Sequence, residues 1–174
     1  MAEKKLILSE ENIQQRIQQL GAEITRDYGD CSLVMVGVLN GAFIFMADLA
    51  RQIDLPLEID FVRVSSYGDK SYSSGELTFT KDVELDISGK DVLLVEDIVD
   101  SGRTIARLKE FFATRHPRSL KICTLIDKTE RREVEVAIDY QGFAIDHGFL
   151  VGYGLDYAEQ HRHYPGIYHL MLDN

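Results

Sequence analysis

The sequence predicts an α/β fold in which a central, mostly parallel sheet is flanked by helices. Three largely apolar runs, at 33–38, 92–95 and 119–127, have the short length and β-branched content of strands that are buried on both faces. A helical spacing of apolar residues follows the first two runs, and this alternation of strand and helix is typical of parallel sheets. With 174 residues, the chain is expected to form a single domain, over 1–174, that buries about 70% of the surface of the unfolded chain.

Composition excludes several classes of protein. The content of 45% hydrophobic and 28% charged residues is ordinary for a soluble globular protein. No apolar run approaches the roughly 20 residues needed to span a bilayer, and the opening MAEKKLILSEEN lacks the apolar core of a signal peptide. Cys31 and Cys123 lie beside apolar runs without the spacing of metal ligands, which favours buried free thiols. We therefore expect a cytoplasmic protein that does not bind membranes.

The net charge of −10 argues against general binding to nucleic acids or anionic membranes. The charge is uneven, because residues 103–132 contain nine Lys and Arg against three acidic residues, which leaves −16 on the rest of the chain. A local basic region in an acidic protein fits a small anionic ligand better than a polyanion. A solvated helix and strand surface is the other explanation for these basic side chains: Arg107, Lys109, Arg115 and Arg118.

The first element expected along the chain is a helix from Ser9 to about Gly29. Ser9 is a favourable N-cap, and apolar residues recur at helical spacing at Ile13, Ile17, Leu20 and Ile24. We expect this helix to pack on the sheet and to take no part in chemistry.

A strand–loop–helix unit follows. The strand at 33–38 leads through Asn40 and Gly41 into a helix over about 42–53. Free backbone N–H groups at such a turn can bind an anion, although similar turns also serve as plain connections.

The next segment predicts a hairpin with a long tip. Residues 57–65 have the partial alternation of a strand, and an extended stretch at 76–85 is expected to return as the second arm. Between the arms, 66–75 is polar, serine-rich and without periodicity. A disordered surface loop is one interpretation, and a lid that closes over a reacting group and excludes water is the other.

The segment at 91–104, DVLLVEDIVDSGRT, contains the residues around which the chain is organised. Glu96 and Asp97 stand where its apolar run ends, Asp100 follows, and the run SGRT leads into a helical pattern that ends near Thr114. A strand, an acidic turn, a small-residue loop and a helix form the layout of a phosphate site, because free N–H groups and the helix dipole face the loop. The motif is neither a Walker loop nor a dinucleotide GxGxxG.

The acids need a partner other than phosphate, since carboxylates repel it. Hydroxyl groups or a metal ion are suitable partners, which points to a phosphorylated sugar rather than to bare phosphate. For each acid taken singly, an ordinary loop position is the competing interpretation, with Asp100 or Ser101 capping the following helix.

Two further stretches place polar or aromatic side chains after expected strands. Lys128 follows the strand at 119–127, a place where lysines are more often simply solvated. The run FLVGYGLDYAEQHR, at 149–162, contains Phe149, an aromatic residue of a kind that usually belongs to a core. The last apolar run, 167–172, is expected to be an edge strand.

These motifs together resemble a known family. The run VEDIVDSGRT, at 95–104, is similar to the phosphoribosyl-pyrophosphate binding motif of the type I phosphoribosyltransferases, and the segments at Lys128 and 149–162 are similar to the hypoxanthine-guanine phosphoribosyltransferases. The likeness extends from about Val34 to Arg162. It implies the type I phosphoribosyltransferase fold, with a small hood and a flexible lid hairpin. It also implies purine salvage: the 5-phosphoribosyl group of phosphoribosyl pyrophosphate moves to N9 of hypoxanthine or guanine, giving IMP or GMP and pyrophosphate.

The resemblance assigns a role to each matching residue. Asp100 is implied to be the catalytic base that takes the N7 proton of the purine. The residues implied to bind phosphoribosyl pyrophosphate are Glu96, Asp97, Ser101, Gly102, Arg103, Thr104, Ser66, Tyr67, Asn40, Gly41 and Arg162. Those implied to bind the purine are Lys128, Phe149, Leu150 and Asp156, and those implied to hold Mg²⁺ are Glu96, Asp97 and Asp156. The family is usually dimeric or tetrameric, which implies a homodimer or a homotetramer.

Two positions depart from the family pattern. Asn40 stands where a basic residue is common, which removes a positive charge from the implied pyrophosphate site. Leu150 stands where valine is more usual. At Lys128 the pattern is kept, and the physics agrees with it: an ammonium group donates to a 6-oxo group but cannot accept from a 6-amino group, which implies that adenine is rejected.

Three other functions share parts of the pattern. A xanthine-, uracil- or orotate-specific phosphoribosyltransferase has the same central motif but differs around Lys128 and Phe149. A non-catalytic regulator that senses metabolites retains the sugar site, and the departure at Asn40 keeps that alternative open. An unrelated nucleotide-binding module leaves the acidic pair Glu96 and Asp97 unexplained.

Overall fold

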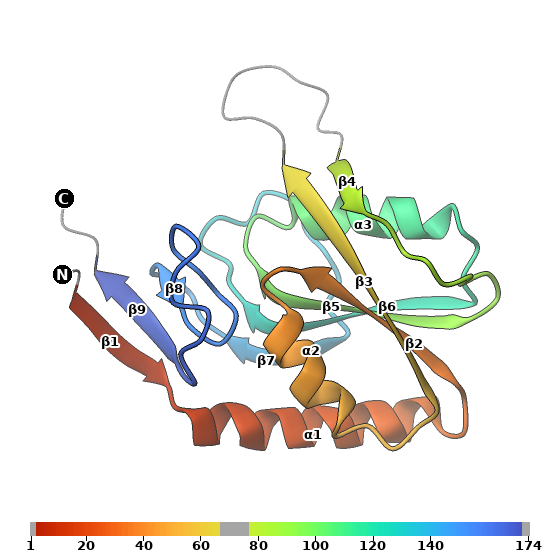
Figure 1. Cartoon of the computed structure of the whole chain (residues 1–174), viewed down its shortest axis with the longest axis horizontal. Coiled ribbons are helices and arrows are strands. Elements are labelled where there is room, and N and C mark those ends of the chain that lie inside the picture. Colours follow the sequence, from red (N-terminus) through yellow and green to blue (C-terminus); the bar gives the residue numbers. More distant parts are fainter. Residues whose placement is uncertain (1–2, 67–76, 172–174) are drawn as a thin grey trace.

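The computed structural model describes residues 3–66 and 77–171 (Figure 1). Its larger sheet has six strands in the order β4-β3-β2-β5-β6-β7. These strands are β2 (Leu33–Leu39), β3 (Leu57–Ser66), β4 (Leu77–Lys81), β5 (Asp91–Val99), β6 (Ser119–Asp127) and β7 (Tyr140–Ala144). All neighbouring strands run parallel except β4, which pairs antiparallel with β3 at the edge and completes the predicted hairpin. The predicted α/β fold with a mostly parallel central sheet is confirmed.

Helices cover both faces of this sheet, with α1 and α2 on one face and α3 on the other (Figure 1). The helices are α1 (Glu10–Tyr28), α2 (Phe43–Ala50) and α3 (Arg103–Ala113). Side chains of β5 alternate between the two layers: Leu93 and Val95 pack with α1 and α2, whereas Val92 and Leu94 pack with α3. A strand covered on both sides in this way is apolar throughout, which is why VLLV has no polar alternation.

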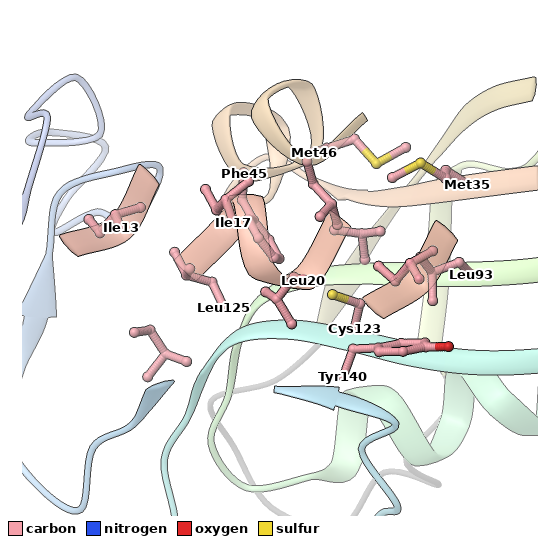
Figure 2. Packing of buried hydrophobic residues seen from close by; sticks show 14 of the residues in the cluster. Ile13, Ile17, Leu20, Met35, Phe45, Met46, Leu93, Cys123, Leu125 and Tyr140 are labelled. Carbon is pink, nitrogen blue, oxygen red and sulfur yellow. The ribbon is translucent and has the colours of Figure 1, made fainter. Parts of the chain in front are cut away.

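The larger part of the core lies under α1 and α2. Figure 2 shows side chains of these helices, among them Leu20 and Phe45, gathered over the sheet residues Leu93, Cys123 and Leu125. All five are fully buried. Since burial of one such side chain contributes about 1.5–3 kcal/mol, this cluster fixes both helices on the sheet and holds the loops at its edge in place.

The first helix follows the sequence prediction closely. The side chain of Ser9 accepts a hydrogen bond from the backbone N–H of Asn12 at 3.2 Å, which caps the helix. The four predicted contact residues are buried: Ile13, Ile17, Leu20 and Ile24. Gly29 ends the helix with a φ of 60°, and its N–H returns to the carbonyl of Thr25.

A second, three-stranded sheet forms a small hood, which lies to the left in Figure 1. It has the order β1-β9-β8, and its strands are β1 (Glu3–Leu8), β9 (Ile167–Met171) and β8 (Leu150–Val151). The prediction of an edge strand for the last run was wrong, because β9 is central and pairs on its two sides with β1 and β8. The sequence did not reveal β1, since this strand is almost entirely exposed and has no buried face to set a pattern.

Three local predictions also need correction. The strand β5 does not end with its apolar run but continues through Glu96 and Asp97, paired with β6 as far as Val99. Helix α2 ends at Ala50 rather than near residue 53. The hydrogen bonds that follow, from the N–H groups of Gln52 and Ile53, go to carbonyls three residues earlier, as in a 3₁₀ turn. Cys31 is exposed, since it lies in the turn before β2, whereas Cys123 is buried as expected.

No helix in the described parts of the chain is long and apolar enough to cross a membrane.

Candidate active site

The predicted site residues meet at one edge of the larger sheet. Because β2, β5 and β6 are parallel, the loops that follow them start from the same edge. The loop after β2 carries Asn40 and Gly41, the loop after β5 carries Asp100, and Lys128 directly follows β6. The backbone N–H of Lys128 donates to the carbonyl of Val99 at 2.9 Å, which fixes the last two loops side by side.

Two cavities open at this edge. The larger has a volume of about 360 Å³ and is lined by Asp97, Ile98, Asp100, Lys128, Glu130, Arg131, Gly148, Phe149, Leu150, Leu155 and Asp156. The smaller has a volume of about 180 Å³ and is lined by Glu96, Asp97, Ile98, Val99, Asp100, Ser101, Gly102, Thr104 and Ile105. Asp97, Ile98 and Asp100 line both cavities. A ligand with two parts, one in each cavity, would therefore have its junction at these carboxylates.

The acidic pair at the end of β5 is buried. Glu96 and Asp97 are only 7% and 8% exposed. Burial, and after it the charge of Asp97, raises the pKa of Glu96 well above its usual range. Burial also raises the pKa of Asp97, against the lowering effects of its hydrogen bonds and of the positive charge of Arg162. Two adjacent buried carboxylates of this kind are suited to a cationic or hydroxyl-bearing partner.

Oxygen donors of this type fit a hard divalent cation such as Mg²⁺, which binds to one or two protein carboxylates and to substrate phosphates. Asp156 lines the larger cavity together with Asp97, but it is ion-paired with Arg162 at 3.0 Å. Within residues 3–66 and 77–171, no three acidic, His or Cys side chains gather closely enough to hold a metal by themselves. The structure therefore brings Glu96 and Asp97 together and does not join Asp156 to them as a third ligand.

The loop after β2 is packed tightly against the acidic pair. A Cβ atom added to Gly41 would overlap the Oδ2 atom of Asp97. On the other side of the same loop, Gly154 has a φ of 98°, and a Cβ there would overlap the carbonyl oxygen of Gly41. The peptide bond between Leu39 and Asn40 is cis. Glycine is required at Gly154, where a side chain would meet backbone, whereas a side chain at Gly41 would displace the carboxylate of Asp97.

The small-residue loop begins α3 with a left-handed glycine. Gly102 is the N-cap residue with a φ of 82°, and no side chain caps the helix there. The competing interpretation, in which Asp100 or Ser101 is the N-cap residue, is therefore excluded, although Ser101 accepts a hydrogen bond from the N–H of Arg103 at 3.3 Å. Ser101, Gly102 and Thr104 line the smaller cavity. Arg103 lines neither cavity described here, since its exposed side chain pairs with Glu133.

Asp100 has an acceptor that is not used. Its Oδ1 atom is buried without a hydrogen-bond partner among the described residues, and its Oδ2 atom is 3.9 Å from the Nζ of Lys128. A buried unpaired carboxylate oxygen is unfavourable, and here it belongs to a residue that lines both cavities. The Asp100 carboxylate therefore has a hydrogen-bonding capacity that the described residues do not use.

Lys128 is not solvated, although lysines at strand ends usually are. The residue is 5% exposed, and its ammonium group lies 3.2 Å from Glu130 in the wall of the larger cavity. Across the cavity, the hood contributes Phe149 and Leu150. The rings of Phe149 and Tyr157 are nearly perpendicular, and their centroids are 5.4 Å apart.

Arg132 is a residue of the site that sequence reasoning missed. Its largely buried guanidinium group donates to the carbonyls of Asp100, Val99 and Lys128 and pairs with Asp127. It thus ties the loop after β5 to the loop after β6. The sequence signal was weak, because Arg132 is one of nine cations between residues 103 and 132.

Two arginines of that basic region pair with acids outside the region. Arg115 pairs with Asp82, and Arg118 pairs with Asp91 at the opposite end of β5. These two arginines therefore pair with acids of the protein itself, and not with the small anionic ligand that the local excess of positive charge suggested.

The predicted lid cannot be placed against the site. Ser66 is the last residue of β3 and pairs with Leu77. The side chain of Ser66, all of Tyr67 and the segment as far as residue 76 lie outside the described residues.

Comparison with known proteins agrees with this geometry. A family profile described as "Phosphoribosyl transferase domain" matches residues 5–158. The chain is 46% identical over 170 residues to the hypoxanthine phosphoribosyltransferase of Salmonella typhimurium, covering 97% of this chain and 96% of the relative. It is 48% identical over 164 residues to the hypoxanthine-guanine phosphoribosyltransferase of Bacillus subtilis, covering 94% and 91%. A crystal structure of a hypoxanthine-guanine phosphoribosyltransferase from Bacillus anthracis superposes with a TM-score of 0.92 at 42% identity, covering 97% of this chain and 99% of the other.

Proposed function

This chain belongs to the phosphoribosyl transferase family, in its hypoxanthine(-guanine) branch, and we propose that it is a purine salvage enzyme. It transfers the 5-phosphoribosyl group of phosphoribosyl pyrophosphate to N9 of hypoxanthine, and of guanine, giving IMP or GMP and pyrophosphate. The observation that carries this proposal is the pair of joined cavities, because each half of a purine mononucleotide has its own cavity and the junction is lined by Asp97 and Asp100.

The sugar phosphate occupies the smaller cavity. Backbone N–H groups at the start of α3 and the hydroxyls of Ser101 and Thr104 bind the 5-phosphate. Arg103 contributes only after it separates from Glu133. The pyrophosphate lies against Asn40 and Gly41 in the loop after β2, and Arg162 supplies the positive charge that Asn40 does not.

Glu96 and Asp97 bind the ribose hydroxyls, and their buried carboxylates fit Mg²⁺ bound together with the substrate. When bound, this ion neutralises the charge that develops on the departing pyrophosphate. Asp156 is held by Arg162 at the wall of the larger cavity, so it acts on the purine side. Ser66 and Tyr67 belong to the proposed lid, which excludes water from the cationic sugar.

The purine occupies the larger cavity. Its ring stacks on Phe149, and backbone groups of Leu150 and Asp156 meet its edge. Lys128 donates to the 6-oxo group, and Asp100 accepts the N7 proton with its unpaired oxygen as N9 becomes nucleophilic. A 6-amino group in the same place leaves two donors facing each other, so adenine is rejected.

Pyrophosphate release tests the proposal. The purified protein is incubated with phosphoribosyl pyrophosphate and Mg²⁺, with hypoxanthine, guanine, xanthine, adenine and uracil offered separately. We expect turnover with hypoxanthine or guanine and none with adenine or uracil. Folded protein that binds the sugar pyrophosphate but turns over no base would instead be a metabolite-sensing regulator.

We also propose that the protein is a cytoplasmic homodimer or homotetramer. Sedimentation velocity measures the number of subunits.

A further inference from the structure

The ammonium group of Lys128 lies between two carboxylates in the larger cavity. It is 3.2 Å from Oε2 of Glu130 and 3.9 Å from Oδ2 of Asp100. The Lys128 side chain is only 6% exposed, so water cannot replace a lost partner freely. The position of this ammonium group therefore depends on which of the two carboxylates attracts it more strongly.

Glu130 is supported by its surroundings. It belongs to the turn after β6, which is closed by a hydrogen bond from the N–H of Arg132 to the carbonyl of Thr129 at 3.0 Å. The hydrogen bond with Lys128, and to a lesser degree the backbone of Gly148, lowers the pKa of Glu130. The Glu130 carboxylate is thus ionised and interacts with both Lys128 and the backbone of Gly148, where the loop that leads into the hood begins.

Asp100 offers the competing position. Its buried Oδ1 atom has no partner among the described residues, and its Oδ2 atom is beyond hydrogen-bond distance from Lys128. Without Glu130, the nearest acid to the buried ammonium group within the part of the chain that the structure describes is Asp100. A small rotation of the lysine side chain then forms an ion pair with the Asp100 carboxylate through its Oδ2 atom.

We propose that Glu130 is a positioning residue, which holds the Lys128 ammonium group toward the base and away from Asp100. This inference rests on the proposed function, in which Lys128 binds the 6-oxo group and Asp100 takes the N7 proton. Glu130 keeps the two roles separate: the donor stays available to the purine oxygen, and the acceptor stays available to the proton. An exposed ion pair is ordinarily worth little, but this one controls a buried cation.

Four proteins test the proposal: the unchanged chain, Glu130→Ala, Lys128→Ala and the double variant. We expect Glu130→Ala to lower kcat with hypoxanthine roughly 10- to 100-fold, because Lys128 masks the catalytic base. Lys128→Ala raises the KM for hypoxanthine instead and lowers kcat less, since Asp100 stays free. The double variant recovers the kcat of Lys128→Ala to within about threefold, because the masking group has been removed. Glu135→Ala, an exposed acid on the same connection, is the matched control and leaves both constants unchanged.

A crystal structure of Glu130→Ala supplies a readout that does not need turnover. We expect the Lys128 Nζ to move from 3.9 Å to about 3 Å from Asp100, the distance of a charged hydrogen bond. A lysine that keeps its position, or a double variant that is slower than both single variants, overturns the role of Glu130. If the unchanged chain uses no base, the proposed function is overturned instead. The crystal structure of Glu130→Ala then still shows whether Glu130 determines the position of the Lys128 ammonium group.

Discussion

The two cavities of this site are built in different ways. Every residue that lines the smaller cavity comes from one segment, between Glu96 and Ile105. The larger cavity draws on three segments, which are the end of β5, the turn after β6 and the hood loop that begins at Gly148. Under the proposed function, the phosphate site is therefore a local structure, made by one strand, one loop and one helix. The base site is a tertiary structure, which forms only when the hood is placed over the sheet.

What the sequence could predict follows this division. The acidic pair and the loop before α3 are recognisable in VEDIVDSGRT, because all of these residues lie in one short run of the chain that joins a strand to a helix. Lys128 and Phe149 were assigned to the purine only through the resemblance, since periodicity alone favours a solvated lysine and a core aromatic residue. Leu155 and Arg132 were missed, because their contacts depend on how distant segments meet.

The same limit explains the errors in the fold. The buried faces of α1 and β5 leave a pattern that can be recognised along the chain. The pairing of β1 with β9 joins the two ends of the chain, and the exposed side chains of β1 carry no such pattern. Nor could the sequence show that β5 continues past its apolar run, because the ladder with β6 is a backbone property.

The largest expected effect is at Asp100, which belongs to both cavities. Asp100→Asn removes the proton acceptor but keeps the shape of the side chain, so we expect kcat to fall roughly 100- to 10,000-fold. Binding of phosphoribosyl pyrophosphate should change little, and titration calorimetry measures it. Asp86→Asn, at an exposed acid outside both cavities, is the control. Equal losses of rate and binding, or no loss, would remove Asp100 from the role of base.

The second largest effect is expected at Gly41, which lies against Asp97, a residue that lines both cavities. Gly41→Ala forces a methyl group against the carboxylate of Asp97, so we expect kcat/KM to fall roughly tenfold or more and the Mg²⁺ requirement to rise. Gly29→Ala is the control, because nothing lies near the added atom there. Its φ of 60° is unfavourable for alanine, a strain that Gly41 does not share. Gly29→Ala should lower the melting temperature without changing kcat/KM. If both variants behave alike, the contact with Asp97 has no functional weight.

Lys128→Ala acts on the larger cavity alone. We expect a rise of roughly tenfold in the KM for hypoxanthine, since one charged hydrogen bond to the 6-oxo group is lost. The KM for phosphoribosyl pyrophosphate should stay the same, and adenine should become a detectable substrate. Steady-state kinetics with each base measures these values. An unchanged preference between hypoxanthine and adenine contradicts the assignment of Lys128 to the purine.

The smallest effect is expected at Arg103, and it tests whether the smaller cavity can bind phosphate without a side chain that has to move. Under the proposed function, backbone N–H groups and two hydroxyls bind the phosphate there, whereas the Arg103 side chain is exposed and paired with Glu133. Since exposed ion pairs contribute about 0–1 kcal/mol, Arg103→Ala should raise the KM for phosphoribosyl pyrophosphate only about threefold. Glu133→Gln releases the arginine and should lower the same KM slightly. A rise of roughly 100-fold in Arg103→Ala would instead mean that the arginine leaves Glu133 when substrate binds, because only a direct charged contact with phosphate accounts for so large a loss. The proposed phosphate site would then need a side chain of its own segment that moves into place, in addition to the backbone groups and hydroxyls.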